Sequence, residues 1–105
     1  MASPQNATPI PERVRLVIAL TEVNSRYLRG ENRCAGAEIE LACALACEKR
    51  EGTTPERTRD IAQLRVRLSA FETELMAVEA ERDWLENALA NFDTAGSGSK
   101  PGDWQ

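Results

Sequence analysis

The chain has 105 residues, no histidine, few aromatic residues and a net charge of −4. This length allows one small domain, and the composition is typical of an extended helical protein rather than a β-rich globule. The acidic balance argues against nucleic-acid binding, which needs a positive surface. The absence of histidine removes the commonest general base and every serine–histidine or cysteine–histidine nucleophile pair.

The N-terminal half predicts a flexible arm followed by one long helix. Prolines recur through residues 1–11, so we expect an irregular arm there. No proline occurs from residue 12 to residue 51, and this stretch predicts the first helix. Gly52 then supplies the residue type that commonly ends a helix.

The C-terminal half predicts a turn, a second helix and a tail. The turn covers residues 52–55, and the second helix covers residues 56–92. Thr54 is a good N-cap, and Pro55 suits the first helical turn because its missing N–H costs nothing there. Glycine and serine dominate much of residues 93–105, which predicts a flexible tail.

Both predicted helices carry residues spaced alternately three and four positions apart, the pattern of a coiled-coil seam. In the first helix these residues are Leu16, Leu20, Val23, Tyr27, Gly30, Cys34, Ala37, Leu41 and Ala44. In the second they are Ile61, Leu64, Leu68, Phe71, Leu75, Val78, Arg82, Leu85, Leu89 and Phe92. The sequence therefore predicts an all-α fold, a long antiparallel two-helix coiled-coil hairpin.

A fold-back at Gly52 sets the register, because residue n then lies opposite residue 105 − n. Small seam residues of the first helix face large ones of the second, for example Gly30 against Leu75. One layer is mismatched, since Val23 meets Arg82, where Glu22 or Glu86 can pair with the arginine. Arginines of residues 13–33 face acids of residues 72–86, and the signs reverse near the turn. These pairs favour the orientation more than the stability, since each is worth only about 0.2–1 kcal/mol.

Each helix also carries a second apolar stripe that cannot face the seam. On the first helix it comprises Val14, Ile18, Thr21, Leu28, Ala35, Ile39, Ala42 and Ala46, beside Val17 and Leu45. On the second it comprises Val66, Ala70, Thr73, Ala77, Ala80 and Trp84. Contiguous exposed apolar area usually marks an interface, and a chain this small has little interior of its own. Our interface candidates are Val14, Ile18, Leu28, Ile39, Val66, Ala77 and Trp84.

Two interpretations of these stripes remain open, and they can coexist. In the first, two hairpins form a homodimer with four-helix-bundle architecture. In the second, part of the surface binds a different protein by helix-in-groove recognition. Trp84 is then either an interface anchor or a cover for the dimer core. Trp104 in the tail is either a short docking motif or a residue without a role.

Charged residues suggest two rival partners. The acidic face comprises Glu72, Glu74, Glu79, Glu81, Asp83 and Glu86, which form either a solvated surface or a docking face for a basic partner. Arg26, Arg29 and Arg33 make a basic ridge, but the opposing glutamates should neutralise most of it. Nucleic acid is therefore an unlikely partner on sequence grounds.

Cysteine usage gives no support for a metal or a cofactor. The odd number of cysteines does not suggest a disulfide framework. Cys34 belongs to the seam, and Cys43 and Cys47 are expected to be small packing residues, because a structural zinc site needs four ligands. No phosphate-binding or dinucleotide-binding glycine motif is present. We expect no catalytic, cofactor-binding or metal-binding residues.

Neither a signal peptide nor a membrane span is visible, so we expect a cytoplasmic protein. The function that the sequence favours is that of a non-enzymatic protein-binding module, acting as an adaptor, a chaperone or an inhibitor. A structural coiled-coil subunit is one alternative. An acidic decoy or nucleic-acid-associated regulatory factor is the other.

Overall fold

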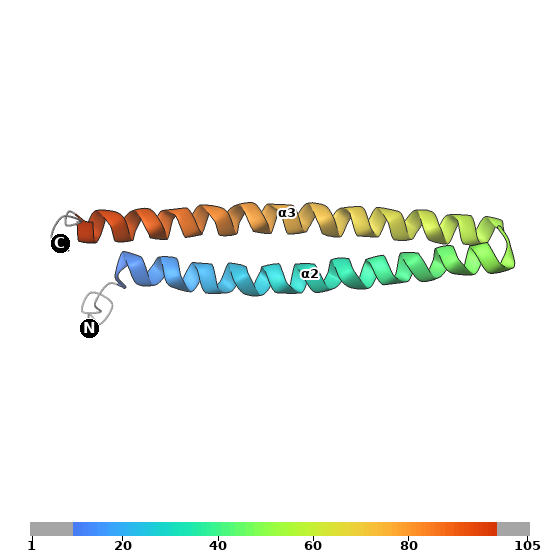
Figure 1. Ribbon diagram of the computed structural model, residues 1–105, viewed down its shortest axis with the longest axis horizontal. Helices are drawn as coiled ribbons and strands as arrows, with labels where there is room; N and C mark the ends of the chain where they lie inside the picture. The colour runs from blue at the N-terminus through green and yellow to red at the C-terminus, as the bar shows by residue number, and fades with distance from the viewer. Residues whose placement is uncertain (1–9, 99–105) are drawn as a thin grey trace, which may run out of the picture.

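The computed structural model describes residues 10–98, which form two long helices. These are α2 (Glu12–Glu51) and α3 (Pro55–Gly98), and they run antiparallel, side by side, from a tight turn (Figure 1). The described residues contain no strand, and the predicted all-α hairpin is confirmed. The predicted arm before residue 10, and the predicted tail beyond residue 98 with Trp104, lie outside the described residues.

The bounds of α2 match the sequence expectation, and those of α3 differ from it at both ends. α2 has the predicted bounds, and α3 begins one residue earlier than expected, at Pro55. α3 continues past Phe92 to Gly98, where a flexible tail was expected. The Arg13 side chain bonds Asp93 at 2.8 Å, and this contact ties the last turns of α3 to the start of α2. This exposed pair is worth less than about 1 kcal/mol, so it helps to hold the helix at Asp93 but does not by itself offset the low helix propensity of Gly96 and Gly98.

The seam between the helices is built from the residues that the heptad pattern predicts. All of them are buried or half-buried except Phe92, which is 40% exposed. Leu16, Val23 and Leu85 form the most buried cluster, and Val23 is completely buried. Phe92 belongs to the last layer of the seam, where residue 13 of α2 is an arginine that bonds Asp93.

The helices pack closely against each other at Gly30. A Cβ atom on Gly30 would come within 2.8 Å of Leu75 Cδ1, so Leu75 occupies the space that a larger residue would need. Residue 30 thus lies against residue 75, as the predicted register requires. Small residues of α2 let the large residues of α3 fill the seam to normal packing density.

Local signals at the turn position the fold-back. Gly52 has φ of +96°, a conformation that costs glycine nothing, and its N–H donates to the Glu48 carbonyl oxygen at 2.8 Å. Thr54 Oγ1 accepts a hydrogen bond from the Arg57 backbone N–H at 3.1 Å, which confirms the predicted N-cap. Together these contacts end α2 and begin α3.

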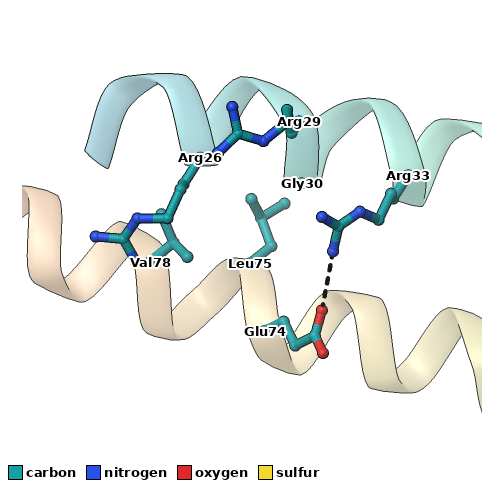
Figure 2. A pocket seen from close by; sticks show the side chains of 7 residues that line it. All are labelled: Arg26, Arg29, Gly30, Arg33, Glu74, Leu75 and Val78. Atoms are coloured by element: carbon teal, nitrogen blue, oxygen red, sulfur yellow. Dashed lines mark hydrogen bonds and ion pairs between the residues drawn. The ribbon is translucent and has the colours of Figure 1, made fainter. Parts of the chain in front are cut away.

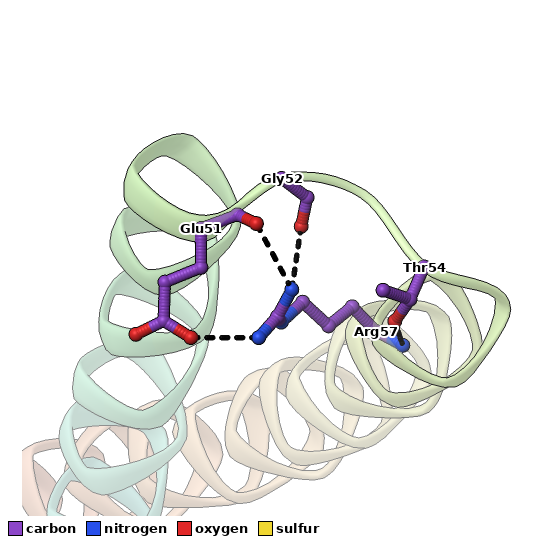
Figure 3. A network of polar contacts seen from close by, with 4 residues as sticks. All are labelled: Glu51, Gly52, Thr54 and Arg57. Atoms are coloured by element: carbon purple, nitrogen blue, oxygen red, sulfur yellow. Dashed lines mark hydrogen bonds and ion pairs between the residues drawn. The ribbon is translucent and has the colours of Figure 1, made fainter.

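Arg57 closes the turn by reaching back to the end of α2 (Figure 3). Its Nη1 donates to the Gly52 carbonyl oxygen at 2.8 Å, and its Nη2 bonds Glu51 Oε1 at 2.7 Å. The carbonyl groups at a helix C-terminus lack partners within the helix, so a guanidinium there satisfies them and complements the helix dipole. The sequence analysis did not anticipate this contact.

The predicted charge pattern is confirmed along one side of the seam. Besides the Arg57–Glu51 pair at the turn, the ion pairs that join the two helices are Arg13–Asp93, Arg26–Glu81, Arg33–Glu74 and Arg67–Glu40. Arginine lies on α2 far from the turn and on α3 near it, as expected. These side chains are well exposed, so the pairs mainly favour the antiparallel orientation.

Replacing Leu68 with aspartate should lower the free energy of unfolding by about 3 kcal/mol or more, because it places an unpaired charge in the seam. Val66→Asp is the matched control two residues away, where the side chain is 70% exposed. Its expected cost is below about 1 kcal/mol, from helix propensity alone. Thermal melts followed by circular dichroism compare the two variants, and equal losses would contradict the register.

Replacing Arg57 with methionine should lower the free energy of unfolding by about 1–2 kcal/mol, since charge-assisted hydrogen bonds to Gly52 and Glu51 are lost. Arg59→Met removes the same charge from an exposed side chain of the same helix. Urea titration of both variants measures the difference. A stability equal to that of the Arg59 variant would show that the clamp contributes nothing.

Candidate protein-interaction surface

The apolar stripes predicted outside the seam are exposed along both helices. On α2, Leu28 is 61% exposed and Ile39 is 64% exposed. On α3, Val66 is 70% exposed and Trp84 is 65% exposed. The remaining interface candidates, Val14, Ile18 and Ala77, are exposed as well. The hairpin thus leaves about two fifths or more of each large side chain among them exposed.

The two stripes lie on the outer edges of the hairpin rather than together on one face. On each helix the stripe is about 150° around the axis from the seam, given about 100° per residue. A protein that covers the α2 stripe therefore approaches from the side opposite to one that covers the α3 stripe. Each stripe is a separate candidate interface.

Met76 extends the α3 stripe and was missed by the sequence analysis. Its side chain is 68% exposed, and it lies three residues after Thr73 and four before Ala80. The three–four spacing could have revealed it, since neighbours at these spacings share a helix face. An exposed methionine adds flexible apolar surface to this edge of α3, which suits binding.

The predicted acidic face divides between the two sides of the seam. All of its members are exposed, but Glu74 and Glu81 are held by Arg33 and Arg26. Glu72, Glu79 and Glu86 follow one another at seven-residue intervals and form no ion pair with another described residue. These three carboxylates form an uncompensated acidic row along α3.

Arg82 stacks on Tyr27 in the seam layer that the sequence analysis identified as mismatched. The Arg82 guanidinium carbon lies 3.9 Å from the centre of the Tyr27 ring. Neither Glu22 nor Glu86 forms an ion pair with Arg82, contrary to the expectation, and Arg82 Nε is buried without a hydrogen-bond partner among the described residues. The cation–π contact therefore takes the place of the expected salt bridge.

The same layer perturbs Tyr27. Glu31 accepts a hydrogen bond from the phenol, which raises the pKa of Tyr27 above its ordinary value. Burial and the carboxylates of Glu31 and Glu79 also raise this pKa, whereas Arg82 opposes them. All these effects except that of Arg82 favour the neutral phenol.

The basic ridge surrounds a shallow hollow at the Gly30–Leu75 contact (Figure 2). Arg26 and Arg33 bond Glu81 and Glu74 at 2.8 and 3.4 Å, so their charges are compensated as expected. The hollow has a volume of about 160 Å³ and is half open. Small-molecule sites usually have about 300–1,000 Å³, so this hollow is too small to enclose a typical ligand.

The cysteines are free and serve no visible metal site. Cys34 is buried in the seam, where burial and then the nearby carboxylates raise the pKa of its thiol. Cys43 is exposed and Cys47 is half-buried. Among the residues that the structure describes, no histidine, cysteine or acidic side chains gather in a group of three or more that could hold a metal.

The hydrophobicity of the described helices also bears on membranes. Neither α2 nor α3 has an apolar stretch that is long enough to cross a bilayer.

Titration of the Tyr27 hydroxyl should occur above its ordinary pKa of 10.0. Because folding raises this pKa, the stability that the neutral phenol contributes is complete below pH 10 and is lost as the pH rises through the folded-state value. Glu31→Gln should bring the pKa back towards 10.0, and Glu38→Gln should not change it. Tyr27 is the sole tyrosine, so ultraviolet absorbance of the phenolate reports it directly. Identical titration of native and denatured chains would contradict the assignment.

Comparison with known proteins does not identify a partner for this surface. No protein-family model matches the chain, and no curated protein or solved structure is significantly similar to it. Inference about function therefore depends on the exposed stripes, the acidic row and the Tyr27–Arg82 layer.

Proposed function

We propose that the chain is a non-enzymatic protein-binding module that acts as an adaptor, a chaperone or an inhibitor of another protein. The observation that carries this proposal is the exposure of large apolar side chains along both outer edges. Such contiguous apolar surface is usually covered by a partner. A homodimer covering part of this surface belongs to the same proposal.

The α3 stripe is the better candidate for a different protein. Trp84 is 65% exposed, and tryptophan is enriched among residues that dominate binding energy. Val66 and Met76 extend the apolar surface along the same helix. An amphipathic groove or helix in the partner can accept side chains at this spacing.

Charge beside Trp84 suggests the character of the partner. Asp83 and Glu86 are exposed and form no ion pair with another described residue. Around the α3 axis, Asp83 points about 100° away from Trp84 and Glu86 about 160° away. The partner of Trp84 therefore needs an apolar groove, with a basic rim only on the side of Asp83, where charge would speed its association. The free cysteines suit a reducing compartment, so we place the module in the cytoplasm.

A second candidate function is that of an acidic decoy. The uncompensated row of Glu72, Glu79 and Glu86 favours it, because such a row can occupy a basic surface that otherwise holds nucleic acid. Binding of this kind would weaken steeply with added salt, whereas apolar docking at Trp84 would not. The same exposed stripes also support the alternative of a purely structural coiled-coil subunit.

Replacing Val66 and Trp84 together with glutamate should abolish capture of the partner. The bait is the full chain in a lysate of the organism that encodes it, and bound proteins are identified by mass spectrometry. For the purified partner, calorimetry should show an affinity at least about tenfold weaker, as loss of a hot spot implies.

The control for this capture experiment is Thr58→Glu with Ala62→Glu, which adds the same charge at exposed positions of α3 near the turn. This variant should capture the same partner as the wild-type chain. If the wild-type and both variant chains retain an identical set of proteins, the α3 stripe is not the binding surface.

A further inference from the structure

The α2 stripe has the unbroken three–four spacing of a second coiled-coil stripe. Ser25 and Asn32 fill its two gaps, so the three–four spacing runs without interruption from Val14 to Ala46. The full set is Val14, Ile18, Thr21, Ser25, Leu28, Asn32, Ala35, Ile39, Ala42 and Ala46, and every member is exposed. None carries a charge, although charged residues occupy much of the rest of α2.

An uncharged strip of this length requires an uncharged strip in its partner, since burial of an unpaired charge is strongly unfavourable. A second copy of the same strip meets that requirement. In antiparallel pairing about a two-fold axis, residues of the two strips lie opposite each other when their residue numbers sum to 60. The layers are then Val14–Ala46, Ile18–Ala42, Thr21–Ile39, Ser25–Ala35 and Leu28–Asn32.

This register places every large side chain of the α2 stripe against a small or short one. A shift by one heptad in either direction loses that match. With a sum of 67, Leu28 meets Ile39, and with a sum of 53, Val14 meets Ile39. The same large-against-small rule governs the seam within the hairpin, where Gly30 receives Leu75. Val17 and Leu45 would then meet at the rim of the new seam and extend its apolar area.

We propose that α2 pairs with α2 of a second copy, antiparallel, about a two-fold axis near residue 30. The dimer is a layer of helices in the order α3–α2–α2–α3, because the α2 stripe lies on the edge away from α3. This arrangement differs from a compact four-helix bundle, in which each helix would bury two adjacent faces.

The size of this interface predicts a reversible dimer. The strip from residue 14 to residue 46 is about 48 Å long and about 10 Å wide, given the dimensions of a helix. Two such strips bury on the order of 1,000 Å², which is the lower limit for a specific interface. At the axis Arg29 meets Arg29 and Glu31 meets Glu31 at exposed rims, and this repulsion also limits the affinity.

The dimer leaves both α3 stripes uncovered. Trp84 of each copy lies on an outer edge of the layer, so the assembly presents two equivalent docking surfaces that face away from each other. This part of the inference rests on the proposed function, because it assigns the α3 stripe to another protein. A bivalent adaptor gains avidity for a clustered partner without any new contact.

Sedimentation equilibrium of the full chain tests the dimer without any partner protein. The wild-type chain should show a concentration-dependent dimer, and Ile18→Glu with Leu28→Glu should give a monomer with unchanged helicity. Val66→Glu with Trp84→Glu adds the same charge to the α3 stripe and should still dimerise. A monomeric wild-type chain, or loss of the dimer in the α3 variant alone, would overturn the proposal and leave the proposed function intact.

Spin-label distances test the register and the direction of pairing. A nitroxide on Cys43, with Cys34 and Cys47 replaced by alanine, should lie about 40 Å from its counterpart, since the two positions are about 13 residues to either side of the axis. A label on Glu31→Cys, in a chain whose three native cysteines are replaced by alanine, should lie within about 25 Å of its counterpart, because helices in contact are 8–10 Å apart. Short distances for both labels would indicate parallel pairing and would contradict the proposal.

Discussion

The packing of small α2 residues against large α3 residues is the constraint on which the rest of the structure depends. Leu75 fills the space above Gly30, and no side chain at residue 30 would fit there without displacing it. This fit fixes the register, and the register fixes which side of each helix is buried. Because the seam residues recur every 3.5 residues, they form a single stripe along each helix. The stripe on the opposite side of each helix therefore remains at the outer edge of the hairpin.

The same register determines the electrostatics of the surface. It aligns Arg26 with Glu81 and Arg33 with Glu74 on one side of the seam, where charges cancel. On the other side Glu72, Glu79 and Glu86 find no cation, and Arg82 turns onto Tyr27. The protein is thus balanced in charge along one broad face and acidic along the other. Trp84 and the acidic row lie on different sides of α3, so a partner that covers Trp84 does not also cover that row.

Repeating patterns made the fold predictable, whereas single side-chain conformations did not. The heptads, Gly52 and Thr54 suffice for the hairpin, its turn and its register, because each is a local signal with one structural outcome. The Arg57 clamp and the stacking of Arg82 depend on where long side chains settle in three dimensions. The end of α3 was misplaced because glycine and serine suggested a tail from Asp93, whereas the helix continues to Gly98. The exposed stripes were predicted from spacing, but spacing carries no information about the identity of a partner.

The distance between the two arms tests the fold-back register most directly. Spin labels on Asn24→Cys and Glu79→Cys, in a chain whose native cysteines are replaced by alanine, occupy exposed positions on facing helices. Dilution with unlabelled chain removes distances between copies. The register predicts a separation within about 25 Å, since packed helices are 8–10 Å apart. A separation near 80 Å, the length of 55 residues in one continuous helix at about 1.5 Å each, would contradict the hairpin and with it the outer binding edges.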